Sequence, residues 1–298
     1  MYKPQNFFFA LMQLGIGTRK STRLETLPTE ETWKAVMQMA QKQAVLGIVV
    51  DGMLKLPAEY LPPAPIKLKG IQQLLRIEQL NRRLNGEAVQ VSEFLQAEGY
   101  ACTILKGQGI AQYYPNPLHR MPGDIDVWPD AEPDVLRKYG RKKFYDKEWS
   151  ALQHIMRHLF SEGIGLRQLT DYALVLRKGM IPAEKEEALQ TLRRLNMEGF
   201  TEAVMYVLQT VFALEPEYLL CAPDERKGKL LLEEILEGGN FGFYDRRGDK
   251  RNLANKVKKR AHKFLRVFSL APSEAVWSFL FFTRAFFLRR WHRLKLSS

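Results

Sequence analysis

Two aspartates, Asp124 and Asp126, have the residue type and the spacing that metal chemistry requires. They alternate with Ile125 and Val127, and on a β-strand residues i and i+2 point to the same side. Two carboxylates on one side of a strand repel each other unless a cation lies between them. Oxygen ligands of this kind suit Mg²⁺. We interpret the pair as metal-ligating, with two solvated loop acids as the alternative.

Three residues near the aspartates are of types that bind phosphate. Gly107 follows an apolar run, residues 100–105, and a glycine there lets backbone N–H groups approach a phosphate closely. Lys106 and Arg120 supply cations, and an arginine grips phosphate through two parallel hydrogen bonds. We predict that Lys106, Gly107 and Arg120 bind phosphate. The alternative for the two cations is pairing with nearby acids.

The elements that must position these residues are two short strands within a helical chain. The β-type runs cover residues 100–105 and 124–128, joined by a short helical turn at 109–114 and a proline-rich loop. A strand pair this isolated is not stable alone and must pack on helices. Cys102, on the first run, is expected to be a small buried apolar residue.

Helical patterns flank the strands on both sides. Thr29 predicts an N-cap, with apolar residues at helical spacing as far as Ala44. Residues 68–95 form a long pattern that Gly99 ends. Further helices are predicted over residues 149–161, 166–178, 183–195, 201–213, 224–236, 253–268 and 273–293.

The predicted fold class is therefore α+β, predominantly helical, with a small mixed β-sheet core between N-terminal and C-terminal helices. We divide the chain into an N-terminal helical region at 1–98 and a shortened β core at 99–148. A helical domain at 149–237 and a basic, aromatic helical tail at 238–298 follow.

The ordered motifs resemble a known family. A strand ending in Leu-Lys-Gly, a short helix, Tyr-Pro-x-Pro-x-x-Arg and Gly-Asp-Ile-Asp are similar to the uncharacterised bacterial nucleotidyltransferases of the DNA polymerase β-like superfamily. The stretch 158–171 resembles the helical segment of that family. The resemblance covers residues 33–176 and extends to the Gly-Gly-Asn-Phe-Gly stretch at 238–242.

The resemblance implies a Mg²⁺-dependent enzyme. Asp124 and Asp126 would be its catalytic metal ligands, and Gly107 would lie against the triphosphate of an NTP. The enzyme would move a nucleoside monophosphate to a hydroxyl or phosphate acceptor. The sequence names neither the acceptor nor the base of the nucleotide.

The resemblance also implies a third carboxylate on a later strand. Asp146 is the candidate, while Asp130 and Asp134 are expected to be loop or cap residues. If that carboxylate is missing, the protein would bind a nucleotide without efficient catalysis, which is the alternative function.

The net charge of +12 is concentrated in the tail. Residues 246–298 contain 15 Lys and Arg against two acids, so the rest of the chain is close to neutral. We expect a solvated helix with ordinary core residues, a helix on an anionic membrane surface, or a nucleic-acid-binding element.

The compartment is expected to be cytoplasmic, and the membrane interpretation of the tail would place the protein at the inner membrane face. Two cysteines exclude a disulfide framework. The apolar run 7–14 has no clear cleavage site, which argues against a signal peptide. The run 275–288 is shorter than a membrane span needs.

Two further pairs of residues are spaced four positions apart, which places their side chains next to each other on a helix. His154 and His158 have a metal-like spacing, but packing on a helix is favoured because no further ligand supports a zinc site. Arg167 and Asp171 fit a helical ion pair. The family resemblance suggests that this second pair holds the helical domain against the sheet.

Overall fold

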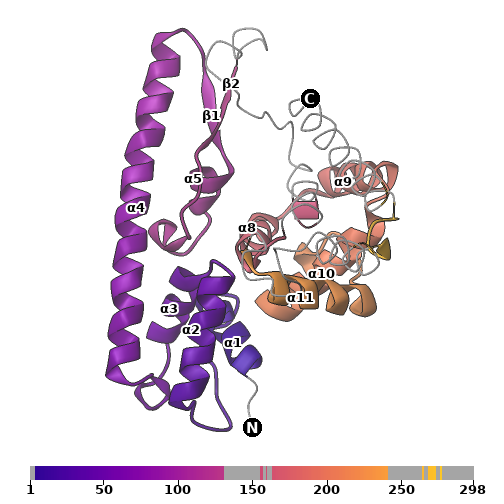
Figure 1. Cartoon of the computed structure of the whole chain (residues 1–298). Helices are drawn as coiled ribbons and strands as arrows, with labels where there is room; N and C mark the ends of the chain where they lie inside the picture. The colour runs from indigo at the N-terminus through magenta and orange to yellow at the C-terminus, as the bar shows by residue number, and fades with distance from the viewer. Residues whose placement is uncertain are drawn as a thin grey trace, which may run out of the picture.

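The protein is mainly helical and carries one small antiparallel sheet (Figure 1). This computed structural model describes residues 4–130, 155–156, 159, 163–240, 264, 268–272 and 276. The predicted predominantly helical α+β class is confirmed. The sheet within the described residues consists of two antiparallel strands, whereas the sequence led us to expect a mixed sheet.

Three helices form the N-terminal bundle: α1 (Pro4–Ile16), α2 (Glu30–Lys42) and α3 (Leu46–Leu54). The predicted cap is present, because the Thr29 hydroxyl accepts a hydrogen bond from the Thr32 N–H at 3.2 Å. Helix α2 ends before Ala44, which adopts a φ of 54°. Helices α1 and α3 are apolar on nearly all sides, so they lack the alternation of polar and apolar faces that indicates a surface helix.

Helix α4 (Ala64–Ala97) is the long helix that the pattern at 68–95 predicts. Its lower half packs on α3 and its upper half lies beside the sheet (Figure 1). A 3-10 turn, η1 (Ala58–Tyr60), precedes it. The buried positions recur along one face, at Gly70, Leu74, Ile77, Asn81, Ala88 and Leu95.

The sheet pairs β1 (Cys102–Leu105) with β2 (Asp126–Pro129). Between them lie the short helix α5 (Lys106–Ala111) and the 3-10 turn η2 (Pro117–His119). Cys102 is only half-buried, since β1 forms the sheet with a single partner strand among the described residues. Both cysteines are free thiols.

The C-terminal helices are α8 (Leu166–Leu176), α9 (Pro182–Arg194), α10 (Glu198–Phe212) and α11 (Glu225–Gly238), with a 3-10 turn η3 (Pro216–Tyr218). All four lie where the sequence predicts helices. Gln43, which follows α2, connects them to the N-terminal bundle. Its side chain accepts from the Leu166 N–H at 3.1 Å and donates to the Ile235 carbonyl at 3.0 Å.

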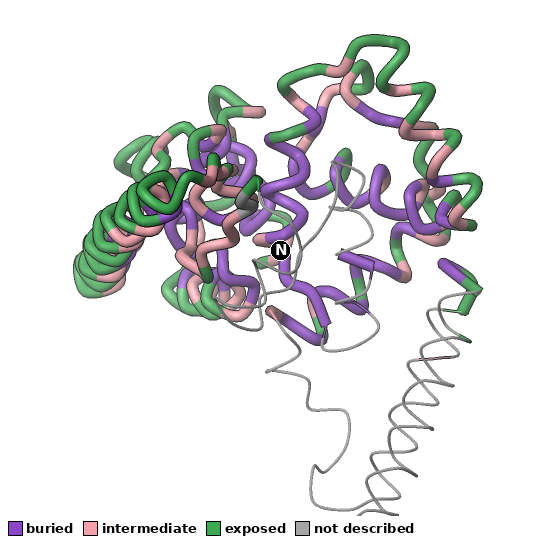
Figure 2. Tube along the Cα trace, turned by 90° about the horizontal axis from the view of Figure 1, so that it is seen from above, coloured by how far each residue is buried: buried purple, intermediate pink, exposed green. Residues whose placement is uncertain are grey.

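The core lies where α1, α3, α8, α10 and α11 meet, and buried residues gather in this interior (Figure 2). Phe7 of α1 packs edge-on against Trp33 of α2, with ring centroids 4.9 Å apart. Gln13 donates to the Val211 carbonyl of α10 at 3.1 Å. The apolar run at 7–14 therefore forms part of the core. Among the described helices, none has the length and apolar character to cross a bilayer.

Several predictions concern residues outside the described ones. These are Asp134 and Asp146, the histidine pair at 154 and 158, and the stretch 241–242. Most of the predicted helices at 149–161, 253–268 and 273–293, and most of the basic tail, also belong here. The division into four domains stays a prediction.

Candidate functional site

The structure brings the glycine turn and the two aspartates together at one end of the sheet. In the antiparallel register Leu105 pairs with Asp126, so the residues after β1 lie beside the residues before β2. The chain reverses there through Lys106 and Gly107, with φ of 38° and 31°. A Cβ on Gly107 would lie 2.8 Å from the Asp124 carbonyl oxygen, so only glycine fits this contact.

Asp124 is not on the strand, which corrects one step of the sequence interpretation. Strand β2 begins at Asp126, and Asp124 lies exposed in the segment before it. The reason is the turn at Lys106 and Gly107, because β1 has already ended and offers no residue with which Asp124 could pair. The two carboxylates are thus close in the chain, but strand alternation does not align them.

The pKa of Asp126 is shifted by burial and by the charges around it. Burial raises the pKa of Asp126, and the negative charge of Asp124 raises it further. The cations Lys106 and Arg120 oppose this shift without cancelling it. A divalent cation bound at Asp126 would favour its ionised form.

Arg120 is buried in an ion pair. Its Nε and Nη2 donate to the two oxygens of Asp171 on α8, at 2.8 and 2.7 Å. The Tyr114 hydroxyl donates to the same carboxylate at 2.6 Å. Pairing with an acid was the alternative to phosphate binding, and the structure shows this pairing. A phosphate contact of Arg120 stays a prediction.

The loop that carries Arg120 is anchored on the other side by α3 and α4. His119 lies between Asp51, at 2.7 Å from Nδ1, and Glu78, at 3.0 Å from Nε2. Burial alone would lower the pKa of His119, but the hydrogen bond and charge of Asp51, reinforced by Glu78, raise it. The Asn81 side-chain amide donates to the Leu118 and Arg120 carbonyls, both at 2.7 Å.

The sequence interpretation missed this anchoring. It considered Arg167 as the partner of Asp171, because the two are spaced i,i+4, and did not foresee that the carboxylate of Asp171 binds Arg120 and Tyr114. The expected role of Asp171 in holding α8 against the sheet region agrees with this geometry. No local pattern reveals the partners of His119, because Asp51 and Glu78 lie 68 and 41 positions away.

Asp124 and Asp126 supply the oxygen donors that a Mg²⁺ site with two protein carboxylates and substrate phosphates would use, and such a site stays a prediction. Within them, no group of three His, Cys, Asp or Glu side chains gathers around one point. Asp130 follows β2 and is exposed. Both Asp124 and Asp126 offer only oxygen donors, and the pKa of Asp126 is raised by burial first and by the charge of Asp124 second.

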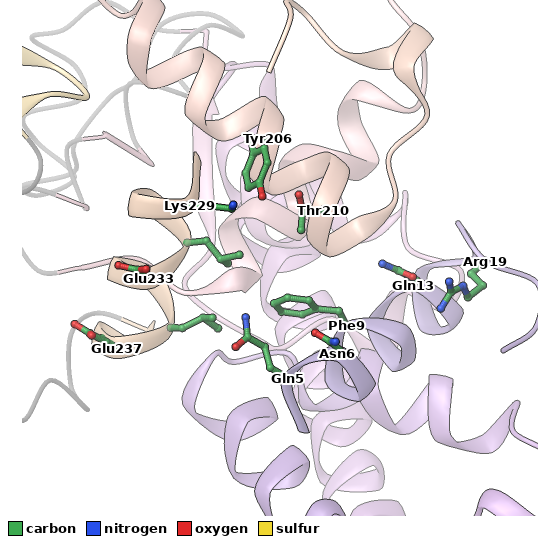
Figure 3. Close-up of a pocket in the computed structure, with 12 residues that line it drawn as sticks. Gln5, Asn6, Phe9, Gln13, Arg19, Tyr206, Thr210, Lys229, Glu233 and Glu237 are labelled. Atoms are coloured by element: carbon green, nitrogen blue, oxygen red, sulfur yellow. The ribbon is translucent and has the colours of Figure 1, made fainter. Parts of the chain in front are cut away.

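A hollow of about 670 Å³ lies elsewhere, between α1, α10 and α11 (Figure 3). Its lining includes Phe9, Tyr206, Lys229 and Glu233, and so combines apolar side chains with charges of both signs. None of the predicted site residues lines it. The candidate chemistry therefore belongs to the sheet end and not to this hollow.

Fold and site together define a mainly helical protein that presents two carboxylates beside a glycine turn. The model of a family described as "Uncharacterised nucleotidyltransferase" matches residues 29–136, from the N-cap of α2 to just beyond β2. This confirms the family resemblance over that stretch and supports a general nucleotidyltransferase activity. No curated protein and no solved structure matches the chain significantly.

Proposed function

We propose that the protein is a Mg²⁺-dependent nucleotidyltransferase that moves a nucleoside monophosphate from an NTP to a hydroxyl or phosphate acceptor. The acceptor oxygen would bond to the α-phosphorus, and the bond from that phosphorus to the bridging oxygen would break. Pyrophosphate leaves, and a hydroxyl acceptor loses its proton. The observation that carries the proposal is the contact of the Gly107 turn with Asp124, next to Asp126.

The residues have distinct roles in this proposal. Asp124 and Asp126 would hold Mg²⁺, which would neutralise phosphate charge and activate the acceptor oxygen. Gly107 would let the turn approach the triphosphate, and Lys106, whose charge acts on Asp126, would attract the same anion. Arg120 supports the loop through Asp171.

The test is Mg²⁺-dependent binding of the four labelled NTPs, followed by measurement of pyrophosphate release. Asp124→Asn and Asp126→Asn should each abolish both signals while the circular dichroism spectrum persists. Asp130→Asn is the matched control, because this exposed acid lies on the same hairpin beyond β2 and should leave both signals unchanged.

Two results would count against the proposal. If the wild-type protein binds no Mg²⁺–NTP, the proposal fails altogether. If it binds nucleotide and releases no pyrophosphate with any hydroxyl or phosphate acceptor tested, the protein is a nucleotide-binding protein and the transfer step is wrong.

A further inference from the structure

Arg167 of α8 lies directly against the turn that leads into Asp124. Its Nη1 donates to the Pro122 carbonyl at 3.0 Å. A Cβ on Gly123 would lie 3.0 Å from the same nitrogen, so the guanidinium occupies the space that a side chain at this position would need. The contact joins α8 to the backbone of the two residues that immediately precede Asp124.

The position of Arg167 is electrostatically costly. Burial lowers the pKa of Arg167, and the positive charge of Arg120 lowers it further, while Asp171 and Asp124 act in the opposite direction. The guanidinium groups of Arg120 and Arg167 thus oppose each other's charge, and Arg120 is bound to Asp171 through two hydrogen bonds.

We propose that Arg167 is a positioning residue for Asp124, which holds the Pro122–Gly123 turn from α8 and so fixes the Asp124 carboxylate beside Asp126. This inference rests on the proposed function, because fixing the two carboxylates matters when they bind a divalent cation. Arg167 lies outside the matched stretch 29–136, so the family match assigns it no role.

The proposal predicts that loss of Arg167 changes the affinity for a divalent cation in the direction opposite to the one that simple electrostatics predicts. Removing a positive charge near Asp124 would by itself strengthen the binding of a divalent cation. Removing a positioning contact weakens it, and supporting residues of metal ligands typically contribute about 10–100-fold in affinity. The direction of the change in divalent-cation affinity therefore distinguishes a positioning role of Arg167 from a purely electrostatic one.

The experiment measures Mn²⁺ binding to the full chain by electron paramagnetic resonance. We expect Arg167→Met to weaken binding by about tenfold, and Arg167→Lys, which keeps a donor and the charge, to recover most of the loss. Gly123→Ala should weaken binding less, because the added methyl displaces the guanidinium by only a few tenths of an ångström. In the double variant, Gly123→Ala should add nothing to Arg167→Met.

Arg177→Met is the matched control. Arg177 caps the other end of α8 and pairs with Glu215 at 2.7 Å, so its loss removes an ion pair without touching the turn. Mn²⁺ affinity should not change in this variant. If Arg167→Met unfolds the protein, Arg167→Lys and Gly123→Ala decide the question, since both preserve the charge.

The outcomes separate the two proposals. A wild-type protein that binds no Mn²⁺ removes the proposed function and this inference together. A wild-type protein that binds Mn²⁺, with equal or tighter binding in Arg167→Met, leaves the proposed function intact and overturns the positioning role. An equal loss in Arg177→Met would also overturn it, because the effect would then come from general destabilisation.

Discussion

The loop from Tyr114 to Arg120 and the pair Asp124 and Asp126, only a few residues further along, are built in opposite ways. In the loop each buried polar side chain has a partner: Tyr114 and Arg120 bind Asp171, and His119 lies between two acids. The pair is more exposed, and the burial of Asp126 works against its ionisation. The loop thus contributes stability, whereas the ionised form of Asp126 lowers it, as groups kept for chemistry commonly do.

The largest expected effect follows from breaking the loop's ion pair. Asp171→Asn would leave the guanidinium of Arg120 buried beside a neutral amide, and loss of one member of a buried pair costs about 3–5 kcal/mol. We expect the free energy of unfolding in urea to fall by that amount. The matched control is Glu215→Gln, which breaks the more exposed pair with Arg177 and should cost less than about 1 kcal/mol. Equal losses in the two variants would contradict the contrast.

Replacement of Asp126 should have the reverse effect, because it should lower activity without lowering the stability of the fold. Asp126→Asn should lower Mg²⁺-dependent nucleotide turnover by at least about a hundredfold, since even supporting residues of metal ligands contribute up to that much. Because the pKa of Asp126 is raised, its ionised form lowers the stability of the folded protein at neutral pH. The variant should therefore be at least as stable as the wild-type protein in urea. A clear loss of stability would show that Asp126 supports the fold.

A smaller effect is expected at Asn81, which holds the loop from α4. Asn81→Leu keeps the volume but leaves the Leu118 and Arg120 carbonyls without this donor, and an unsatisfied buried polar group costs about 1–3 kcal/mol. Thermal unfolding would measure the loss. Gln90→Ala, further along the same helix at an exposed position, should stay within about 0.5 kcal/mol of the wild-type protein. The idea of an anchored loop is wrong if the two variants behave alike.

The smallest expected effect is the pH dependence of the loop. Because Asp51 and Glu78 raise the pKa of His119 in the folded protein, protonation of His119 favours folding. This stabilisation is fully present below the unfolded-chain pKa of 6.5 and is lost as the pH rises through the raised pKa. Unfolding measured above pH 6.5 should show the wild-type protein losing stability with pH more steeply than His119→Gln. Parallel curves would mean that His119 is not held as an imidazolium.

Many of the helices and both strands could be predicted from the sequence. The cap at Thr29, the long helix α4, the four C-terminal helices and the two short strands follow from local patterns of polarity and turn residues. The same patterns missed α1 and α3, because a helix that is apolar on all sides carries no periodic signal. Local patterns therefore predict amphipathic elements well and buried ones poorly.

At the site, the sequence predicted which segments meet but not what supports them, and the chemistry of these residues stays a prediction. The segments that carry Gly107 and Asp124 were expected near each other, and the antiparallel pairing of Leu105 with Asp126 brings them together. The start of β2 at Asp126 depended on where β1 ended, which alternation alone does not define. The partners of Arg120 and His119 come from helices 41 to 68 positions away, and one sequence carries no signal of such distant pairs.

The hydrogen bond from Gln13 to the Val211 carbonyl has a consequence for the timing of folding. It joins residues 198 positions apart, and α1 is buried among segments that include α10. During synthesis at roughly 5–20 residues per second, α1 would wait on the order of ten to forty seconds for that partner. Helices α2 and α3 follow α1 closely and cover part of it, but the side of α1 that faces α10 stays exposed for that time and is a natural binding site for a chaperone.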